Sequence, residues 1–333
     1  MACGSAPHTP LMDGFGRTIS YVRLSLTDRC DMRCRYCMAE EMTFLPRSEI
    51  LSLEEITTLA KHFVARGVTR IRLTGGEPLA RRGAVDVAKS IGELIGDGLE
   101  ELTITTNATT LADHAGGLWD AGIRRINVSL DTRDADVFNY ITRKGDLARV
   151  LGGIDAAKAQ GFAIKINMVA LKGLNDQEIL PMLRWCGEQG FDLSLIETMP
   201  LGEIDEDRTN RFYPLTAARD QIEAHYELLP STHRTGGPAR YWHVPGLGIK
   251  LGLISPLTEN FCSTCNRVRV SASGKLYMCL GHEDHVDLRA ALRGDDPLAL
   301  DAAFDLALGQ KPERHWFDLG EAATQRHMNV TGG

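Results

Sequence analysis

Residues 23–37 read Arg-Leu-Ser-Leu-Thr-Asp-Arg-Cys-Asp-Met-Arg-Cys-Arg-Tyr-Cys, an alternating run followed directly by closely spaced cysteines. Over residues 21–26, apolar and polar side chains alternate as they do along a β-strand. Cys30, Cys34 and Cys37 then follow with the spacing Cys-x3-Cys-x2-Cys. The stretch therefore predicts a strand that ends in a loop able to present three thiolates to one metal site.

Further runs with the same alternation follow, and helix-like segments separate them. The expected strands cover residues 69–74, 102–106, 125–131, 163–169 and 192–196. The first helix-like segment opens with Ser52 and Glu55 in the spacing of a capping box. The other helix-like segments begin near Ala84, Leu111, Leu147 and Glu178. This alternation predicts successive βαβ units, and therefore an α/β fold whose parallel sheet curls into an open or closed barrel.

The two faces of these strands differ in polarity. Buried parallel strands are normally continuous apolar runs, because helices cover one face and the core fills the other. Here polar side chains alternate with apolar ones, so the apolar set packs under the helices while the polar set lines an interior. The cations of this polar set include Arg23, Arg72 and Lys165. The pattern predicts a lumen that holds a hydrophilic, anionic ligand, although one such strand alone would suggest an antiparallel sheet with one wet face.

Length and charge limit the classes of protein to consider. The 333 residues carry 37 basic and 44 acidic side chains, a formal net charge of -7. This balance argues against nucleic acid or an anionic membrane as the main partner. No run reaches the length of a bilayer-spanning helix, and the first residues lack the apolar segment of a secretory signal. We therefore expect a cytoplasmic protein.

Six of the eight cysteines form two groups of three. The first group is Cys30, Cys34 and Cys37, and the second is Cys262, Cys265 and Cys279. A long chain without an export signal is not a disulfide scaffold, and pairing within a group would leave one thiol over. Each group fits either an iron–sulfur cubane with its fourth iron open, or a zinc site that takes a fourth ligand from elsewhere. Spacing alone does not decide between them.

The composition of the chain changes after about residue 231, where Gly and Pro become frequent. Short strand-like runs and further helical sequence follow, and the second cysteine group lies among them. We expect a flexible leader over residues 1–15 and a barrel domain over residues 16–230. A smaller C-terminal α+β region over residues 231–333 would close the barrel.

The neighbours of the first cysteine group favour the iron–sulfur alternative. Tyr36 lies between the last two of these cysteines, and Gly75-Gly76-Glu77-Pro78 ends the second expected strand. Together with the cysteine loop after the first strand, these motifs resemble the radical S-adenosylmethionine (radical SAM) superfamily. The resemblance implies a partial TIM-type (βα)6 barrel, with a second iron–sulfur cluster on the C-terminal region.

Longer motifs indicate a particular family within this superfamily. Over nearly the whole chain, the sequence is similar to the molybdenum-cofactor GTP 3′,8-cyclase family, in segments 23–30, 72–78, 126–131 and 261–267 and in the closing Gly332-Gly333. The resemblance implies a lyase with two [4Fe–4S] clusters that uses S-adenosylmethionine (SAM). A 5′-deoxyadenosyl radical would abstract the C3′ hydrogen of GTP, and (8S)-3′,8-cyclo-7,8-dihydroguanosine 5′-triphosphate would form. It further implies an electron donor, cyclic pyranopterin monophosphate synthase as the next enzyme, and a homodimer.

The resemblance also implies roles for individual residues. Each cysteine group would ligate one [4Fe–4S] cluster, and no side chain is singled out as catalytic because the radical arises at the first cluster. SAM would be contacted by Tyr36, Gly76, Ser129 and Met199. GTP, chiefly its triphosphate, would be contacted by Arg23, Arg72, Thr105, Lys165, Arg267, Val268 and Arg269. Four of these GTP contacts belong to the barrel domain, and all four lie on the polar faces of the expected strands. They are Arg23, Arg72, Thr105 and Lys165.

Two positions depart from the family pattern. Ser194 stands where arginine is usual, so one phosphate or ribose contact is missing or comes from elsewhere, with Arg208 and Arg211 as candidates. Ala108 stands where glycine is usual, which affects a turn. The Gly332-Gly333 tail is expected to reach the active site.

Two other functions stay open. Another two-cluster radical enzyme, such as a peptide modifier, would have the same cysteine groups. A zinc-stabilised binding module without catalysis would use both groups as structural sites.

Overall fold

The computed structural model describes residues 9–204 and 208–332. Within this part of the chain the strands form one twelve-stranded sheet. From edge to edge the sheet contains β12 (His285–Asp287), β11 (Lys275–Tyr277), β10 (Arg267–Val270), β1 (Tyr21–Ser25), β2 (Arg70–Thr74), β3 (Glu101–Thr106), β4 (Arg125–Ser129), β5 (Ala163–Val169), β6 (Asp192–Ile196), β9 (Ile249–Ile254), β8 (Arg240–Val244) and β7 (Leu229–Ser231).

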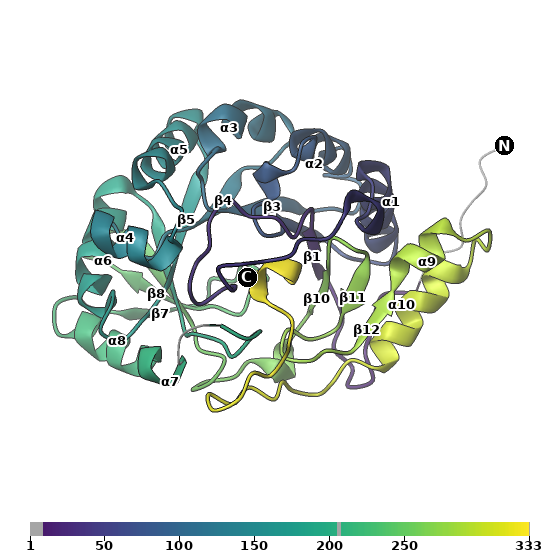
Figure 1. Cartoon of the computed structure of the whole chain (residues 1–333). Helices are drawn as coiled ribbons and strands as arrows, with labels where there is room; N and C mark the ends of the chain where they lie inside the picture. The colour runs from purple at the N-terminus through teal and green to yellow at the C-terminus, as the bar shows by residue number, and fades with distance from the viewer. Residues whose placement is uncertain (1–8, 205–207, 333) are drawn as a thin grey trace.

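Strands β1 to β6 form the parallel part of the sheet, each paired with the next in chain order. The sheet curls, and the helices between the strands lie on its outer side (Figure 1). These outer helices are α1 (Leu53–Ala65), α2 (Ala84–Gly92), α3 (Leu111–Asp120), α5 (Leu147–Gln160) and α6 (Ile179–Gln189). The expected partial α/β barrel is confirmed, and α4 (Ala135–Thr142) is a helix that the sequence pattern did not indicate.

Helix α1 illustrates how local sequence sets these elements. Its capping box is complete, because Ser52 Oγ accepts from the Glu55 N–H at 3.1 Å while the Ser52 N–H donates to Glu55 Oε2 at 2.6 Å. On the face turned inward, Ile56, Leu59 and Phe63 are buried and join the apolar side chains of β1 and β2 in one core. Each such side chain contributes about 1.5–3 kcal/mol on burial. The polar face of the strands is thereby left to the lumen.

The C-terminal region extends the barrel sheet at both edges. Strand β10 pairs in parallel with β1, so that Arg269 is the register partner of Arg23. Strand β9 pairs in parallel with β6, with Gly252 opposite Ser194. The C-terminal α+β region is thus continuous with the barrel sheet, and the domain boundaries that composition suggested stay a prediction.

Helices of the C-terminal region pack beside α1. Arg66, the residue after α1, donates to Asp301 at 2.9 Å and Asp305 at 2.5 Å, and the rings of Phe63 and Phe304 lie 4.6 Å apart. The remaining helices are α7 (Arg208–Arg211), α8 (Leu215–Glu223), α9 (Leu288–Arg293), α10 (Ala299–Gly309) and α11 (Met328–Thr331). Apolar contact and ion pairs together fix α10 to the barrel.

Residues 9–15 differ from the flexible leader that we expected. Leu11 is fully buried, its N–H donates to the Arg66 carbonyl, and its own carbonyl accepts from the Ile19 N–H. Asp13 is also buried. The few apolar residues here, Leu11, Met12 and Phe15, follow neither a helical nor a strand period, which is why the sequence did not reveal this attachment. The rest of the expected leader, residues 1–8, lies outside the described residues.

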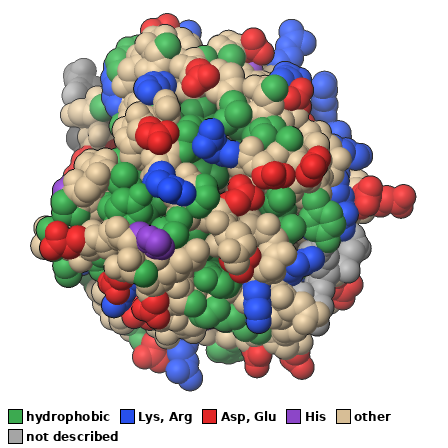
Figure 2. All heavy atoms as spheres, turned by 90° about the vertical axis from the view of Figure 1, so that its left-hand side faces the viewer, with side chains coloured by type: hydrophobic (Ala, Val, Ile, Leu, Met, Phe, Trp, Pro, Cys, Tyr) green, Lys and Arg blue, Asp and Glu red, His purple; other side chains and the backbone are tan. Residues whose placement is uncertain are grey.

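The outer surface shows charges of both signs. On the side of the molecule that is on the left of Figure 1, basic and acidic side chains are interspersed with hydrophobic ones (Figure 2). This face therefore has no continuous basic field of the kind that binds nucleic acid. In the described part of the chain, no helix combines the length and apolar character needed to cross a bilayer.

Candidate functional site

The first cysteine group lies at the end of β1 and lines a cavity of about 1050 Å³. Cys30, Cys34 and Cys37 are partly buried at its wall. The cavity also brings together Tyr36, Gly76, Thr105, Ser129 and Met199. All the residues that the sequence suggested for SAM binding thus border the same space as the first three thiols.

The glycines after β2 hold the cysteine loop against the sheet. The Gly76 N–H donates to the Thr27 carbonyl and the Glu77 N–H donates to the Arg29 carbonyl, both at 2.8 Å. A Cβ atom on Gly76 would lie 2.3 Å from the Arg29 carbonyl oxygen, and one on Gly75 would lie 2.5 Å from the Thr27 oxygen. Glycine at these positions lets the two backbones approach closely, which sets the height of the cysteine loop above the strands.

The donor set of the first cavity fits an iron–sulfur cluster. Burial raises the pKa of Cys30 and Cys34, and raises that of Cys37 to about 12, so a bound metal group would be what keeps these thiols as thiolates. Three thiols from one loop at the wall of one cavity match the three protein ligands of a cubane whose fourth iron is open.

Two buried carboxyl groups support the residues around the first cavity. Glu77 accepts hydrogen bonds from Thr106 Oγ1 (2.8 Å) and the Asn107 N–H (2.7 Å), and burial raises its pKa to about 7. Asp131 accepts from the Tyr36 hydroxyl at 2.7 Å, and burial raises its pKa to about 6. Tyr36 is thereby fixed beside the cysteines.

Asp131 and Asn107 are site residues that the sequence reasoning missed. Asn107 Nδ2 donates to Asp31 in the cysteine loop at 2.6 Å. Asn107 comes directly after β3 and Asp131 lies two residues after β4, at the carboxyl edge of the sheet where barrel proteins place functional side chains. That position was the signal that could have identified them.

The second cysteine group lines a neighbouring cavity of about 990 Å³. Cys262, Cys265 and Cys279 border it. Burial raises the pKa of Cys265, but the nearby cations Arg267 and Lys311 outweigh this effect and lower it to about 7. From the expected GTP set, this cavity is lined by Arg23, Arg72, Lys165, Arg267, Val268 and Arg269.

Buried cations dominate the wall between the two cysteine groups. Arg23, Arg72 and Arg269 are neighbours on three adjacent strands, and Lys165 lies farther round the sheet. Burial lowers the pKa of all four. In the described part of the chain none of them is paired with a carboxylate, and Arg23 Nε has no partner. Such unpaired charges are costly to bury, so the wall is suited to an anionic ligand.

The two cavities adjoin one another. Asn167, Ile196 and Met199, at the ends of β5 and β6, line both of them. The six thiols therefore flank a common chamber, with the cations on its wall.

The C-terminal tail enters this chamber. The Met328 N–H donates to the Cys37 carbonyl at 3.3 Å, and the Gly332 carbonyl accepts from Arg269 at 2.5 Å. Gly332 lines the first cavity in a left-handed conformation (φ +70°), and a Cβ there would lie 2.5 Å from Thr74. The yellow end of the chain in Figure 1 is accordingly at the centre of the curled sheet. Gly333 lies outside the described residues.

The structure explains what surrounds Ser194. Ser194 is fully buried opposite Gly252, and a Cβ on that glycine would meet both Ser194 Oγ (2.7 Å) and Tyr241 (3.0 Å). The Tyr241 hydroxyl accepts from Lys165 Nζ at 3.0 Å. The space beside the small Ser194 is thus filled by an aromatic ring that contacts one of the lumen cations.

The two arginines that we considered as replacements for the usual arginine lie away from the two cavities. Arg208 and Arg211 line a separate pocket of about 300 Å³, and neither borders the two cavities described above. Arg208 instead donates to the carbonyls of Leu201 and Gly202. Neither arginine borders the cavities described above, so the structure does not favour them as the source of the missing contact, and that contact stays a prediction. Ala108, the other departure, keeps the left-handed conformation that favours glycine (φ 64°).

Family models and a solved structure agree on the class of this protein. Residues 24–186 match the model described as Radical SAM superfamily, and residues 191–317 match Molybdenum Cofactor Synthesis C. The crystal structure of Streptococcus suis SuiB bound to S-adenosylmethionine superimposes with a TM-score of 0.61 at 14% identity, covering 94% of this chain and 78% of that chain. The fold and the first cysteine loop are those of a radical SAM protein.

Curated relatives define the family more narrowly. A GTP 3′,8-cyclase of Erythrobacter litoralis (strain HTCC2594) is 59% identical over 97% of this chain and 98% of its own length. Another from Rhizobium meliloti (strain 1021) is 54% identical over 97% of this chain and 95% of its own length. The chain therefore belongs to the GTP 3′,8-cyclase family.

The close approach at Gly76 gives a first prediction. Gly76→Ala is expected to push the cysteine loop away from the sheet, because the new Cβ would lie 2.3 Å from a backbone oxygen. Iron in anaerobically purified protein should then fall from about eight toward about four atoms per chain. Gly14→Ala is the matched control, since open space surrounds that position. Full iron content and unchanged SAM binding in Gly76→Ala would contradict this account of the loop.

Proposed function

We propose that this protein is a radical SAM lyase that cyclises GTP to (8S)-3′,8-cyclo-7,8-dihydroguanosine 5′-triphosphate in molybdenum cofactor biosynthesis. The observation that carries the proposal is the chamber itself, in which two groups of three thiols flank a wall of buried cations. Relatives of the same length and family bear the name of this activity.

In this proposal the first cavity holds the radical-generating cofactors. Cys30, Cys34 and Cys37 would hold a [4Fe–4S] cluster with one iron left open, and SAM would bind beside it. Side chains and backbone of the same cavity contact SAM, namely Tyr36, Gly76, Ser129 and Met199. When bound, such a cluster would supply the electron for the reductive cleavage of SAM, and with it the radical chemistry that removal of the C3′ hydrogen of GTP requires.

The second cavity holds the substrate. Cys262, Cys265 and Cys279 would hold a second [4Fe–4S] cluster. The triphosphate and ribose are held by side chains of this cavity and by Thr105 from the adjoining first cavity; the residues of this cavity are Arg23, Arg72, Lys165, Arg267, Val268 and Arg269. Guanidinium groups form paired, charge-assisted hydrogen bonds with phosphate oxygens, and these bonds are stronger where water is excluded. Fixing the triphosphate and ribose in this way would restrict GTP to conformers in which C3′ lies near C8 of the same molecule.

The chamber also protects a reactive intermediate. A carbon radical must be kept from water and from side reactions, which requires a closed site. The tail at Gly332 lies inside the curled sheet, and the strands with the helices outside them form the wall of the chamber. These elements exclude solvent while the new bond to C8 forms.

Further partners belong to the same proposal. The reaction requires an electron donor for the first cluster, and cyclic pyranopterin monophosphate synthase takes the product as the next enzyme. We place the reaction in the cytoplasm and expect the protein to act as a homodimer. GTP is the substrate class that the cations of the wall support.

The activity is tested with anaerobically reconstituted protein, SAM, a reductant and GTP. Formation of 5′-deoxyadenosine should require both the reductant and GTP, and a cyclised nucleotide should appear in parallel. Liquid chromatography with mass spectrometry measures both products.

Three results would contradict the proposal. Strictly anaerobic protein with about eight irons per chain that forms no cyclised nucleotide would show that GTP is not the substrate. Cleavage of SAM that depends on a peptide instead would identify a peptide modifier. A colourless protein with zinc at both cysteine groups would identify a binding module.

The cationic wall gives a separate prediction. Arg267→Ala and Arg269→Ala should each weaken GTP binding by about 1.5–3 kcal/mol, which corresponds to roughly 10- to 150-fold in Kd. The first cluster should still cleave SAM under strong reduction, because neither residue lines the first cavity. Anaerobic calorimetry measures the affinity, and exposed Arg149→Ala is the control. Unchanged GTP affinity in both wall variants would rule out this phosphate site.

A further inference from the structure

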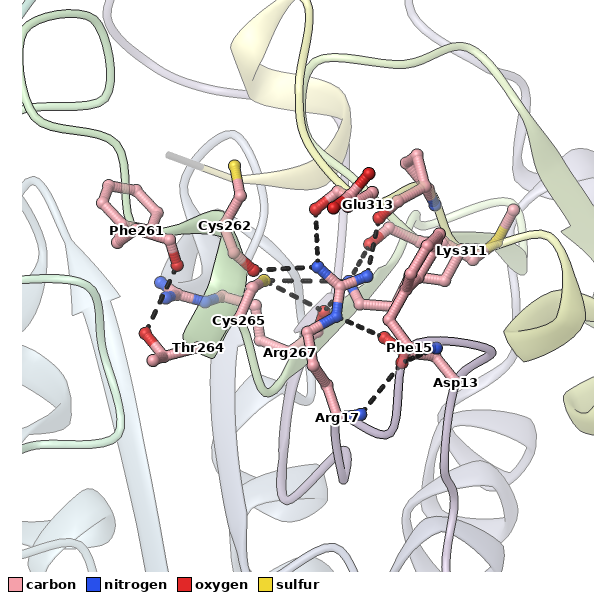
Figure 3. Close-up of polar contacts among 12 residues, drawn as sticks. Asp13, Phe15, Arg17, Phe261, Cys262, Thr264, Cys265, Arg267, Lys311 and Glu313 are labelled. Atoms are coloured by element: carbon pink, nitrogen blue, oxygen red, sulfur yellow. Dashed lines mark hydrogen bonds and ion pairs between the residues drawn. The ribbon is translucent and has the colours of Figure 1, made fainter.

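A buried lysine lies directly behind the second cysteine group. Lys311 Nζ donates to the carbonyls of Arg267 at 3.1 Å and Met278 at 2.6 Å, and lies 3.7 Å from Cys265 Sγ. Its side chain points at this sulfur from the segment after α10, as Figure 3 shows. The ammonium thus bridges the two arms of chain that carry Cys265 and Cys279.

The charge of Lys311 requires a negative partner. Lys311 is only 4% exposed, and within the described residues no aspartate or glutamate forms an ion pair with it. Two neutral carbonyls accept two of the three ammonium protons but leave its charge uncompensated. Cys265 Sγ is the anionic group within reach when that cysteine is a thiolate. Lys311 is not among the residues that line the chamber, so it acts on the cysteine group from behind and not on the ligand in front.

A second cation holds the segments on which this contact depends. Arg17 donates to the carbonyl of Cys262 at 2.8 Å, and to those of Pro312 at 2.6 Å and Glu313 at 2.8 Å. Its Nε is paired with Asp13 at 2.6 Å. Figure 3 shows these bonds converging on one guanidinium group. The N-terminal segment therefore ties the second cysteine loop to the segment that carries Lys311.

We propose that Lys311 is the positioning residue of the second cluster: its ammonium balances the charge on Cys265 and raises the electron affinity of the cluster, while Arg17 keeps the two segments in register. The inference rests on the proposed function, because it takes the second thiol group as the ligand set of a [4Fe–4S] cluster. Net charge and hydrogen bonds at the sulfurs set the potentials of such clusters. A fixed cation beside one sulfur favours the reduced, more negative state.

The experiment compares Lys311→Met and Lys311→Arg in the anaerobic full-length holoenzyme. Redox titration monitored by electron paramagnetic resonance gives the midpoint potential of each cluster, and the second cluster is the one whose signal shifts with GTP. Lys311→Met should move the potential of the second cluster to more negative values, and Lys311→Arg should restore it because the charge is retained. The first cluster should not change. Lys172→Met, an exposed lysine far along the chain, is the control.

Each outcome bears on the proposal. Loss of the second cluster's iron in Lys311→Met but not in Lys311→Arg, with the circular dichroism unchanged, would also support it. Equal potentials and iron content in Lys311→Met and wild type would overturn it, as would an equal shift in Lys311→Met and Lys311→Arg. Wild-type protein without a GTP-sensitive cluster would overturn the proposed function itself, so the two failures are distinguishable.

Discussion

The structure depends on a set of buried cations that face inward from adjacent strands. Arg23, Arg72, Arg269 and Lys165 share one lumen, and burial lowers the pKa of each. Charges of one sign held together away from water destabilise the empty barrel, and an anion between them relieves that repulsion. The polar faces of the strands, the outer helices and the carbonyl of Gly332 can all be understood as ways to build and close this chamber.

Continuity of the sheet joins the two halves of the site. Because β10 pairs with β1, Arg269 lies beside Arg23, and the second cysteine group is carried to the same lumen as the first. At the opposite edge, β9 pairs with β6 and allows Tyr241 to reach Lys165. The C-terminal region is therefore a structural part of the barrel, and its cations and thiols have fixed positions relative to the first cavity.

Local features of this fold could be predicted from the sequence, whereas long-range contacts could not. Alternation along the strands identified the lumen cations, since side-chain direction follows from neighbouring residues alone. The contact between Lys311 and Cys265 spans 46 positions and depends on how α10 packs, so no spacing reveals it. The position of Tyr241 beside Ser194 likewise requires the pairing of β8 with β9. The burial of Leu11 was missed because the short segment around it shows no regular apolar period.

The most direct test is a crystal structure of the anaerobic protein with SAM and GTP bound. The account predicts that the triphosphate contacts Arg23, Arg72 and Arg269. It also predicts that each cysteine group holds one cluster and that both clusters face the same chamber. A triphosphate bound outside the lumen, or clusters that open into separate cavities, would contradict it.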